Sequence, residues 1–109
     1  MRTRLFMLAL SATLAAPVPA LSHDLLCELG QRLSIAGNMM LDQAVDLSWK
    51  GRMYRMMRVG TSTGAQRFED RSSGLILISI PSKAMLLDGR RGEPVANDCR
   101  AGHGGRPAR

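Results

Sequence analysis

Residues 44–59 carry the clearest alternation of apolar and polar positions in the chain. Apolar side chains stand at every second position of residues 44–49, as expected for a strand with one buried face. Lys50 and Gly51 follow, and residues 52–59 alternate again, with Met53, Arg55, Met57 and Val59 on one face and Tyr54, Met56 and Arg58 on the other. Two alternating runs around a two-residue connection that ends in glycine predict a β-hairpin.

Further short β patterns lie on both sides of this hairpin. Residues 23–36 show the period of two in two groups, Leu25, Cys27 and Leu29 and then Leu33 and Ile35, with a bend expected at Gly30. Residues 65–69, 84–87 and 94–100 each predict one strand between turn signals. Residues 75–80 are almost wholly apolar, which predicts a central strand buried on both faces.

The amino end has the features of a signal peptide. Arg2 and Arg4 precede an apolar run of about a dozen residues, and small residues follow at a suitable cleavage site. We expect cleavage after Ala20, with Ser22 as the alternative, and no membrane span afterwards, because a spanning helix needs about 20 apolar residues. Leu26 precedes Cys27, where a lipoprotein signal requires a small residue. The sequence therefore predicts an exported protein, periplasmic or secreted.

Cys27 and Cys99 are the two cysteines of the chain, one near each end of the predicted domain. In an oxidising compartment they predict a disulfide between the first and last strands. Free thiols or a redox centre are the alternative, although no C-x-x-C spacing is present. Seven or so strands with joined ends and no long helix predict a small antiparallel β-barrel over residues 21–100, rather than an open sandwich, and residues 101–109 predict a disordered tail rich in Gly and Arg.

The charge narrows the range of partners. The chain has a net charge of +6, and without Arg2 and Arg4 the 13 remaining basic and 9 acidic residues give +4. The arginines are scattered without interleaved aromatic residues, so we expect no nucleic-acid site. Anionic components of the cell envelope, or an acidic site on a protein, are the expected targets.

The composition offers little catalytic chemistry. The two histidines are His23, beside the predicted cleavage site, and His103, in the predicted tail, and no metal-ligand or phosphate-loop spacing occurs. The sequence therefore predicts neither an enzyme nor a cofactor or metal site. One segment remains of interest: residues 60–64, Gly-Thr-Ser-Thr-Gly, are either an ordinary connection or a loop that donates hydrogen bonds to a partner.

Four motifs of the chain resemble a known family. Residues 27–30 match C-x-x-G, and residues 47–54 resemble the hairpin before the signature loop. Residues 61–68 resemble S-A-S-G-A-R-Y, residues 77–86 stand where F-W-x-K-G-x-x-A-x-L is expected, and Cys99 closes the pattern. This order is similar to that of the MliC/PliC family, the membrane-bound and periplasmic inhibitors of c-type lysozyme.

The resemblance implies a β-barrel that inserts a loop into the active-site cleft of a c-type lysozyme. In the family, a Ser of the loop motif and a Lys of the second motif reach the acidic catalytic residues. The alignment puts Thr63 at that Ser, beside Ser62, and Ile80 at that Lys. Lys83, three residues later, is expected on the opposite face of a regular strand. The residues implied to bind lysozyme are Thr61, Ser62, Thr63, Gly64, Arg67 and Lys83.

Two hypotheses therefore stand. The first is an exported inhibitor of c-type lysozyme that uses the loop from Thr61 to Gly64. The alternative is a non-inhibitory envelope module, which kept the barrel, lost the inhibitory Lys at Ile80 and binds anionic envelope components.

Overall fold

The computed structural model describes residues 22–101 of the 109-residue chain. The predicted signal peptide, residues 1–20, and residues 102–109 of the predicted tail lie outside the described part. The described residues form eight strands and one short 3-10 turn: β1 (Ser22–Leu26), η1 (Glu28–Gly30), β2 (Arg32–Ala36), β3 (Ala44–Trp49), β4 (Arg52–Val59), β5 (Gln66–Asp70), β6 (Leu75–Ile80), β7 (Lys83–Asp88) and β8 (Glu93–Ala101). With η1 as its only helical element, this part holds no helix long and apolar enough to cross a membrane.

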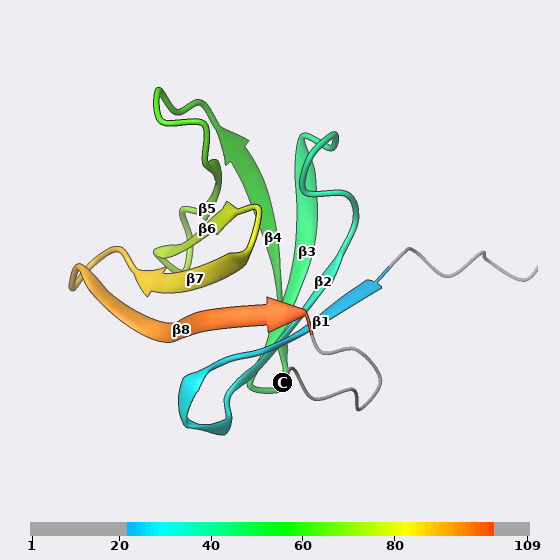
Figure 1. Ribbon diagram of the computed structural model, residues 1–109. Coiled ribbons are helices and arrows are strands. Elements are labelled where there is room, and N and C mark those ends of the chain that lie inside the picture. The colour runs from blue at the N-terminus through cyan, green and yellow to red at the C-terminus, as the bar shows by residue number, and fades with distance from the viewer. Residues whose placement is uncertain (1–21, 102–109) are drawn as a thin grey trace, which may run out of the picture.

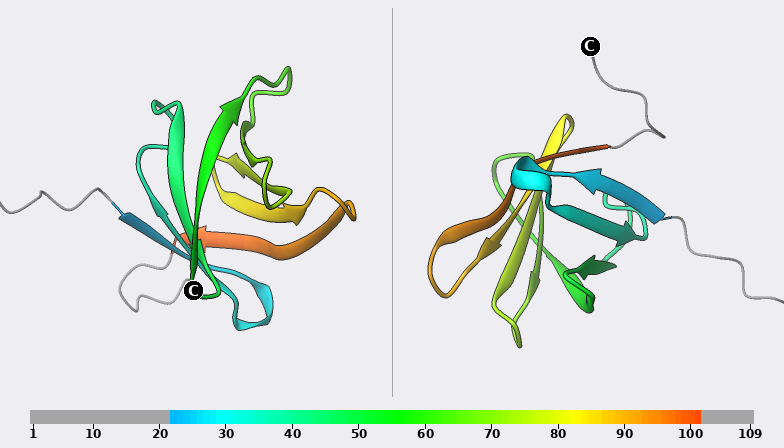
Figure 2. Two further views of the ribbon diagram at one scale, coloured as in Figure 1. Left: turned by 180° about the vertical axis from the view of Figure 1, so that it is seen from behind. Right: turned by 90° about the horizontal axis from the view of Figure 1, so that it is seen from below.

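Each strand pairs antiparallel with the next along the chain, and β8 returns to β1, so the sheet closes into a barrel (Figures 1 and 2). The predicted fold class is confirmed, including the hairpin of β3 and β4. Lys50 and Gly51 have φ values of 51° and 75°. Positive φ at both central residues is the property of the two-residue turn whose twist suits a hairpin.

One face of every strand lines the interior. The core contains one aromatic ring, Phe68, surrounded by aliphatic side chains and Met56: Leu25, Leu33, Ile35, Val45, Leu47, Leu75, Leu77, Ala84, Leu86, Ala96 and Cys99. The placement of Met56 and Tyr54 toward the interior, with Met53 and Met57 outside, follows the two faces that the alternation of β4 predicts.

The prediction that residues 75–80 are buried on both faces is wrong. Leu75 and Leu77 are buried, Ile76 and Ile78 are half-buried, and Ile80 is exposed. The physical reason is that a barrel has a single interior, so every second side chain of β6 lies on its outer surface.

The first predicted segment divides into two strands. Residues 23–36 form β1 and β2, separated by η1, and Leu29 does not share a face with Leu25. Leu29 has a φ of 61° and its side chain is 95% exposed, because the connection reverses the chain there.

The predicted disulfide is present between Cys27 and Cys99, which lie 72 residues apart. Cys27 follows the last residue of β1, and Cys99 lies in β8 with its side chain fully buried. The bridge therefore joins the two strands at which the barrel closes.

Arg58 of β4 closes one end of the barrel. Its guanidinium donates hydrogen bonds to the carbonyl oxygens of Met39 and Asp42 and to the side chain of Gln66, and it lies 4.7 Å from the centre of the Phe68 ring. A guanidinium can satisfy several acceptors at once in a fixed plane. Arg58 is therefore a structural residue, unlike the exposed arginines around it.

Candidate functional site

The loop between β4 and β5 is held in shape by its own hydroxyl groups. The Thr61 hydroxyl donates to the carbonyl oxygen of Ala65 at 2.8 Å, and the Ala65 amide donates to Thr63 Oγ1 at 3.3 Å. Gly64 has a φ of 85°, and a Cβ there would meet no neighbouring atom. The positive φ alone therefore selects glycine at this position.

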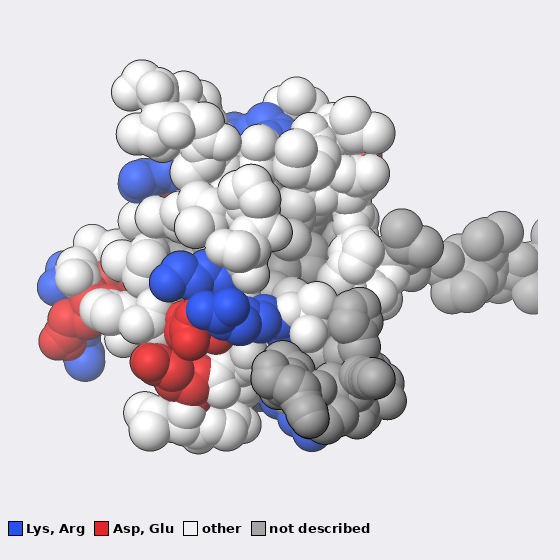
Figure 3. All heavy atoms as spheres, in the orientation of Figure 1, with Lys and Arg blue, Asp and Glu red and all other residues white. Residues whose placement is uncertain are grey.

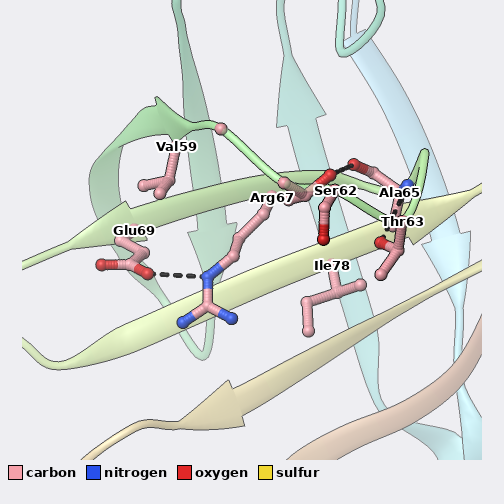
Figure 4. Close-up of a pocket in the computed structure, with 9 residues that line it drawn as sticks. Val59, Ser62, Thr63, Ala65, Arg67, Glu69 and Ile78 are labelled. Carbon is pink, nitrogen blue, oxygen red and sulfur yellow. Dashed lines mark hydrogen bonds and ion pairs between the residues drawn. The ribbon is translucent and has the colours of Figure 1, made fainter.

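Ser62 is the tip hydroxyl that the loop does not use. It is exposed, and its Oγ makes no hydrogen bond with any residue of the described part. Figure 4 shows this hydroxyl pointing toward the side of a hollow that Arg67 and Ile78 line. The resemblance expects Thr63 to take the role of the loop Ser, but the Thr63 oxygen already accepts a hydrogen bond from the Ala65 amide. The Ser62 hydroxyl is therefore the better placed donor and acceptor for a partner.

The hollow beneath the loop has a volume of about 540 Å³ and lies on the outer face of the sheet. Val59, Arg67 and Ile78 stand opposite one another across β4, β5 and β6, so they form one row on that face. The loop from Gly60 to Ala65 covers one side of this row. The site thus combines an apolar floor with a polar rim.

Arg67 is engaged within the site. Its Nε lies 2.7 Å from Oε2 of Glu69, the next residue on the outer face of β5 (Figure 4). This pair neutralises much of the charge that Arg67 would otherwise present to a partner. The terminal nitrogens of its guanidinium make no hydrogen bond with the described residues and remain available as donors.

The expected orientation of Lys83 is wrong. Lys83 pairs directly with Ile80 across the β6–β7 hairpin, and paired residues of an antiparallel ladder share a face. Pro81 and Ser82 form the turn between them. Residues three apart lie on opposite faces only within one regular strand, and Ile80 and Lys83 belong to two paired strands. Lys83 therefore lies beside the position at which the resemblance expects a Lys.

Lys83 lies close to one acidic side chain, that of Asp98. The Nζ of Lys83 lies 3.8 Å from Oδ1 of Asp98, and Nη2 of Arg100 lies 3.0 Å from the same oxygen. Figure 3 shows basic and acidic groups intermixed on the face that carries β7 and β8. Both members of the Lys83–Asp98 pair are partly exposed, and such pairs contribute about 1 kcal/mol or less, so Lys83 can leave Asp98 at little cost.

The structure brings most of the sequence-predicted site residues together. Thr61, Ser62, Thr63 and Arg67 line the hollow, and Gly64 completes the loop above it. Lys83 is at the same end of the barrel, next to Ile80, but does not line the hollow. Sequence reasoning missed Glu69, Val59 and Ile78. The period of two in β4, β5 and β6 is the signal that could have placed them beside Arg67.

Within residues 22–101 no group of three or more His, Cys, Asp and Glu side chains is arranged to hold a metal ion. Comparison with known proteins adds no relative: no family model, no curated protein and no solved structure matches the chain.

Proposed function

We propose that this protein is exported and inhibits a c-type lysozyme, inserting the loop from Thr61 to Gly64 into the acidic active-site cleft of the enzyme. The four motifs that resemble the MliC/PliC inhibitors support the proposal, as does the closed barrel that carries them. The observation that carries it is the tip of the loop. Ser62 presents an unused hydroxyl on a backbone that Thr61 and Thr63 hold in place.

A preorganised loop suits this function because little conformational freedom is lost when it enters a narrow cleft. The Ser62 hydroxyl can donate a hydrogen bond to a carboxylate of the enzyme, and charge-assisted bonds of this kind are the strong ones. Lys83 provides a cation beside Ile80, at the place where the family has its Lys. Arg67 provides further donors on the same side of the barrel.

The test is the rate of cell-wall lysis by a c-type lysozyme, titrated with the purified and oxidised protein. Stoichiometric inhibition is the expected result. If folded protein leaves the lysis rate unchanged, the inhibitor proposal is overturned and the binding of anionic envelope components becomes the function to examine.

Ser62→Asp should abolish inhibition without unfolding the barrel. The new carboxylate would oppose the acidic residues of the enzyme across a desolvated contact, and like charges placed together at an interface cost several kcal/mol. Leu29→Asp is the control, because it adds the same charge at a position that is 95% exposed, in the connection between β1 and β2. Equal inhibition by Ser62→Asp and wild type would exclude the loop tip from the contact.

Lys83→Ala should weaken inhibition by about tenfold, which corresponds to the loss of one charged contact of about 1.4 kcal/mol. Lys50→Ala is a close control: Lys50 is the only other lysine, and it lies in the β3–β4 turn at the opposite end of the barrel. The two variants have the same net charge, so a similar loss in both would point to general electrostatics rather than to a contact of Lys83.

A further inference from the structure

β4 is longer than the ladder that joins it to β5. It pairs with β3 from Arg52 to Met57, but with β5 only from Met57 to Val59. Figure 2, in the view from behind, shows the first part of β4 diverging from β5 and β6. The first half of β4 therefore has a strand neighbour on one side only.

The register identifies the backbone groups on the unpaired side. Trp49 and Arg52 flank the two-residue turn, so they form a hydrogen-bonded pair, and Arg52, Tyr54 and Met56 direct their N–H and C=O groups toward β3. The corresponding groups of Met53 and Arg55 point the other way. They have no backbone partner on that side among the described residues. We call these groups of Met53 and Arg55 the open edge.

A cleft of about 710 Å³ lies beside the open edge. Arg52, Tyr54 and Arg55 line it from β4, and Asp70, Ser73 and Arg90 line it from the turns opposite. Met53 is 68% exposed, so the outer face of the strand beside the open edge is accessible to solvent. The cleft is therefore reachable from solvent along a strand of about five residues.

The far wall of the cleft is a rigid pair of turns. The Gly89 amide donates to the Gly74 carbonyl oxygen at 2.7 Å, and Arg90 Nη2 donates to the Ser72 carbonyl oxygen at 2.8 Å. A Cβ on Gly74 would lie only 2.9 Å from Arg90 Nε. The φ of 82° selects glycine at position 74, and the hydrogen bond to Ser72 holds Arg90 at the rim.

The carboxylates of the cleft accept hydrogen bonds from neighbouring residues, whereas two of its arginines have no carboxylate partner. Arg90 donates to the Ser72 carbonyl oxygen, and the Arg52 guanidinium lies 5.9 Å from the centre of the Tyr54 ring. Asp70 accepts hydrogen bonds from Ser73 and Ser72, and the Ser73 bond is the main reason why the pKa of Asp70 lies below its usual value. Asp88 accepts the Arg90 amide at 2.9 Å. Arg52 and Arg90 have no carboxylate within ion-pair distance in the described part. The guanidinium groups of Arg52 and Arg90 can therefore donate hydrogen bonds to an anionic ligand.

We propose that this cleft binds an extended acidic segment of a partner protein, which adds to the open edge as a further strand. The unpaired N–H and C=O groups supply the main-chain hydrogen bonds, and Arg52 and Arg90 supply the preference for glutamate or aspartate side chains. A second copy of the chain is a poor occupant, because two identical edges would bring Arg52 and Arg55 of each copy together. The site lies at the opposite end of the barrel from the loop that carries Ser62, so a partner could bind there independently of lysozyme.

The experiment measures binding of two fluorescent hexapeptides to the oxidised protein by anisotropy. One peptide alternates glutamate with valine, and the other alternates lysine with valine. We expect saturable binding of the glutamate peptide, at least about tenfold tighter than that of the lysine peptide. A third peptide, the glutamate sequence with N-methyl groups on alternate amides, should lose binding because it cannot form a ladder.

Met53→Pro removes the amide of Met53 from the open edge but leaves the hydrogen bonds to β3 intact. It should weaken binding of the glutamate peptide by about tenfold, whereas Met53→Ala, which keeps the amide, should bind as wild type. Arg52→Gln combined with Arg90→Gln should reduce the preference for glutamate over lysine. Lysozyme inhibition should be the same in all of these variants.

Three results would overturn the proposal. The first is equal binding of the glutamate and lysine peptides, or no binding of either. The second is undiminished binding of the N-methylated peptide, a test that does not depend on whether Met53→Pro folds. The third is a dimer in sedimentation that Met53→Pro dissociates, which would assign the open edge to a second copy of the chain.

Discussion

β1 and β8 share two residue pairs, and β4 and β5 share three, whereas β3 and β4 share six. β2 and β3 also share only three pairs, so three ladders of the barrel are short. Two of them, which we call the β1–β8 seam and the β4–β5 seam, differ in what reinforces them. The first is reinforced by the disulfide between Cys27 and Cys99. The second has no covalent link and contains Arg58, which donates hydrogen bonds to the carbonyl oxygens of Met39 and Asp42 and lies over the Phe68 ring.

The two seams differ in what holds the end of each ladder. The disulfide lies directly beyond the last residue of β1, so the β1–β8 seam is fixed where its ladder ends. Arg58 lies within the β4–β5 ladder, which runs from Met57 to Val59 of β4. The residues of β4 that precede Met57 have no partner in β5. The disulfide therefore holds the end of the β1–β8 ladder covalently, whereas the hydrogen bonds of Arg58 hold one end of the β4–β5 ladder and the first half of β4 lies beside the cleft.

Of the changes that test this comparison, removal of the disulfide should have the largest effect on stability. The double variant Cys27→Ala/Cys99→Ala releases a loop of 72 residues in the unfolded chain, which should lower the free energy of unfolding by on the order of 4 kcal/mol. The free energy of unfolding of a native protein is about 5–15 kcal/mol in total, so much of the stability would be lost. Urea unfolding followed by the fluorescence of Trp49, the single tryptophan, measures the change.

Wild-type protein treated with a reductant should unfold at the same urea concentration as this variant. A midpoint close to that of the oxidised protein would mean that the two pairs between β1 and β8 suffice and that the seams do not differ as described.

Much of the fold could be predicted from the sequence, because the alternation is local. The hairpin of β3 and β4 follows from the period of two and from Lys50-Gly51, and the closure follows from two cysteines near the ends of the domain. The burial of β6 could not be predicted, because an apolar run looks the same on the wall of a barrel and in the middle of a layered sheet. Only the closure of the whole sheet decides which faces are inside.

The candidate site could be predicted only in part. Hydroxyl residues between glycines indicated the loop, but which hydroxyl is unused depends on how Ala65 folds back on Thr61 and Thr63. Lys83 was misplaced because its orientation depends on a turn between two strands rather than on one strand. Arg58 resembled the surface arginines, and its position on the same face as Tyr54 and Met56 was the only signal of its internal role.

Arg58→Met tests the second seam and should have a smaller effect than removal of the disulfide. The carbonyl oxygens of Met39 and Asp42 would lose a charged donor, and hydrogen bonds to charged groups contribute about 1.5–3 kcal/mol each. Because both acceptors lie near the surface and water can replace part of the loss, we expect the free energy of unfolding to fall by about 2 kcal/mol. Hydrogen exchange should speed up at the amides of the β4–β5 ladder more than at those of β1 and β8.

Arg55→Met is the matched control for this prediction. Arg55 lies in the same strand and pairs with Asp46 at 3.2 Å, but its side chain is 66% exposed, and such surface pairs contribute about 1 kcal/mol or less. The same chemical change at the two positions therefore separates an internal arginine from an external one. Equal destabilisation by the two variants, or exchange that speeds up at both seams alike, would show that Arg58 does not hold the β4–β5 seam and that the ladder of three pairs is sufficient by itself.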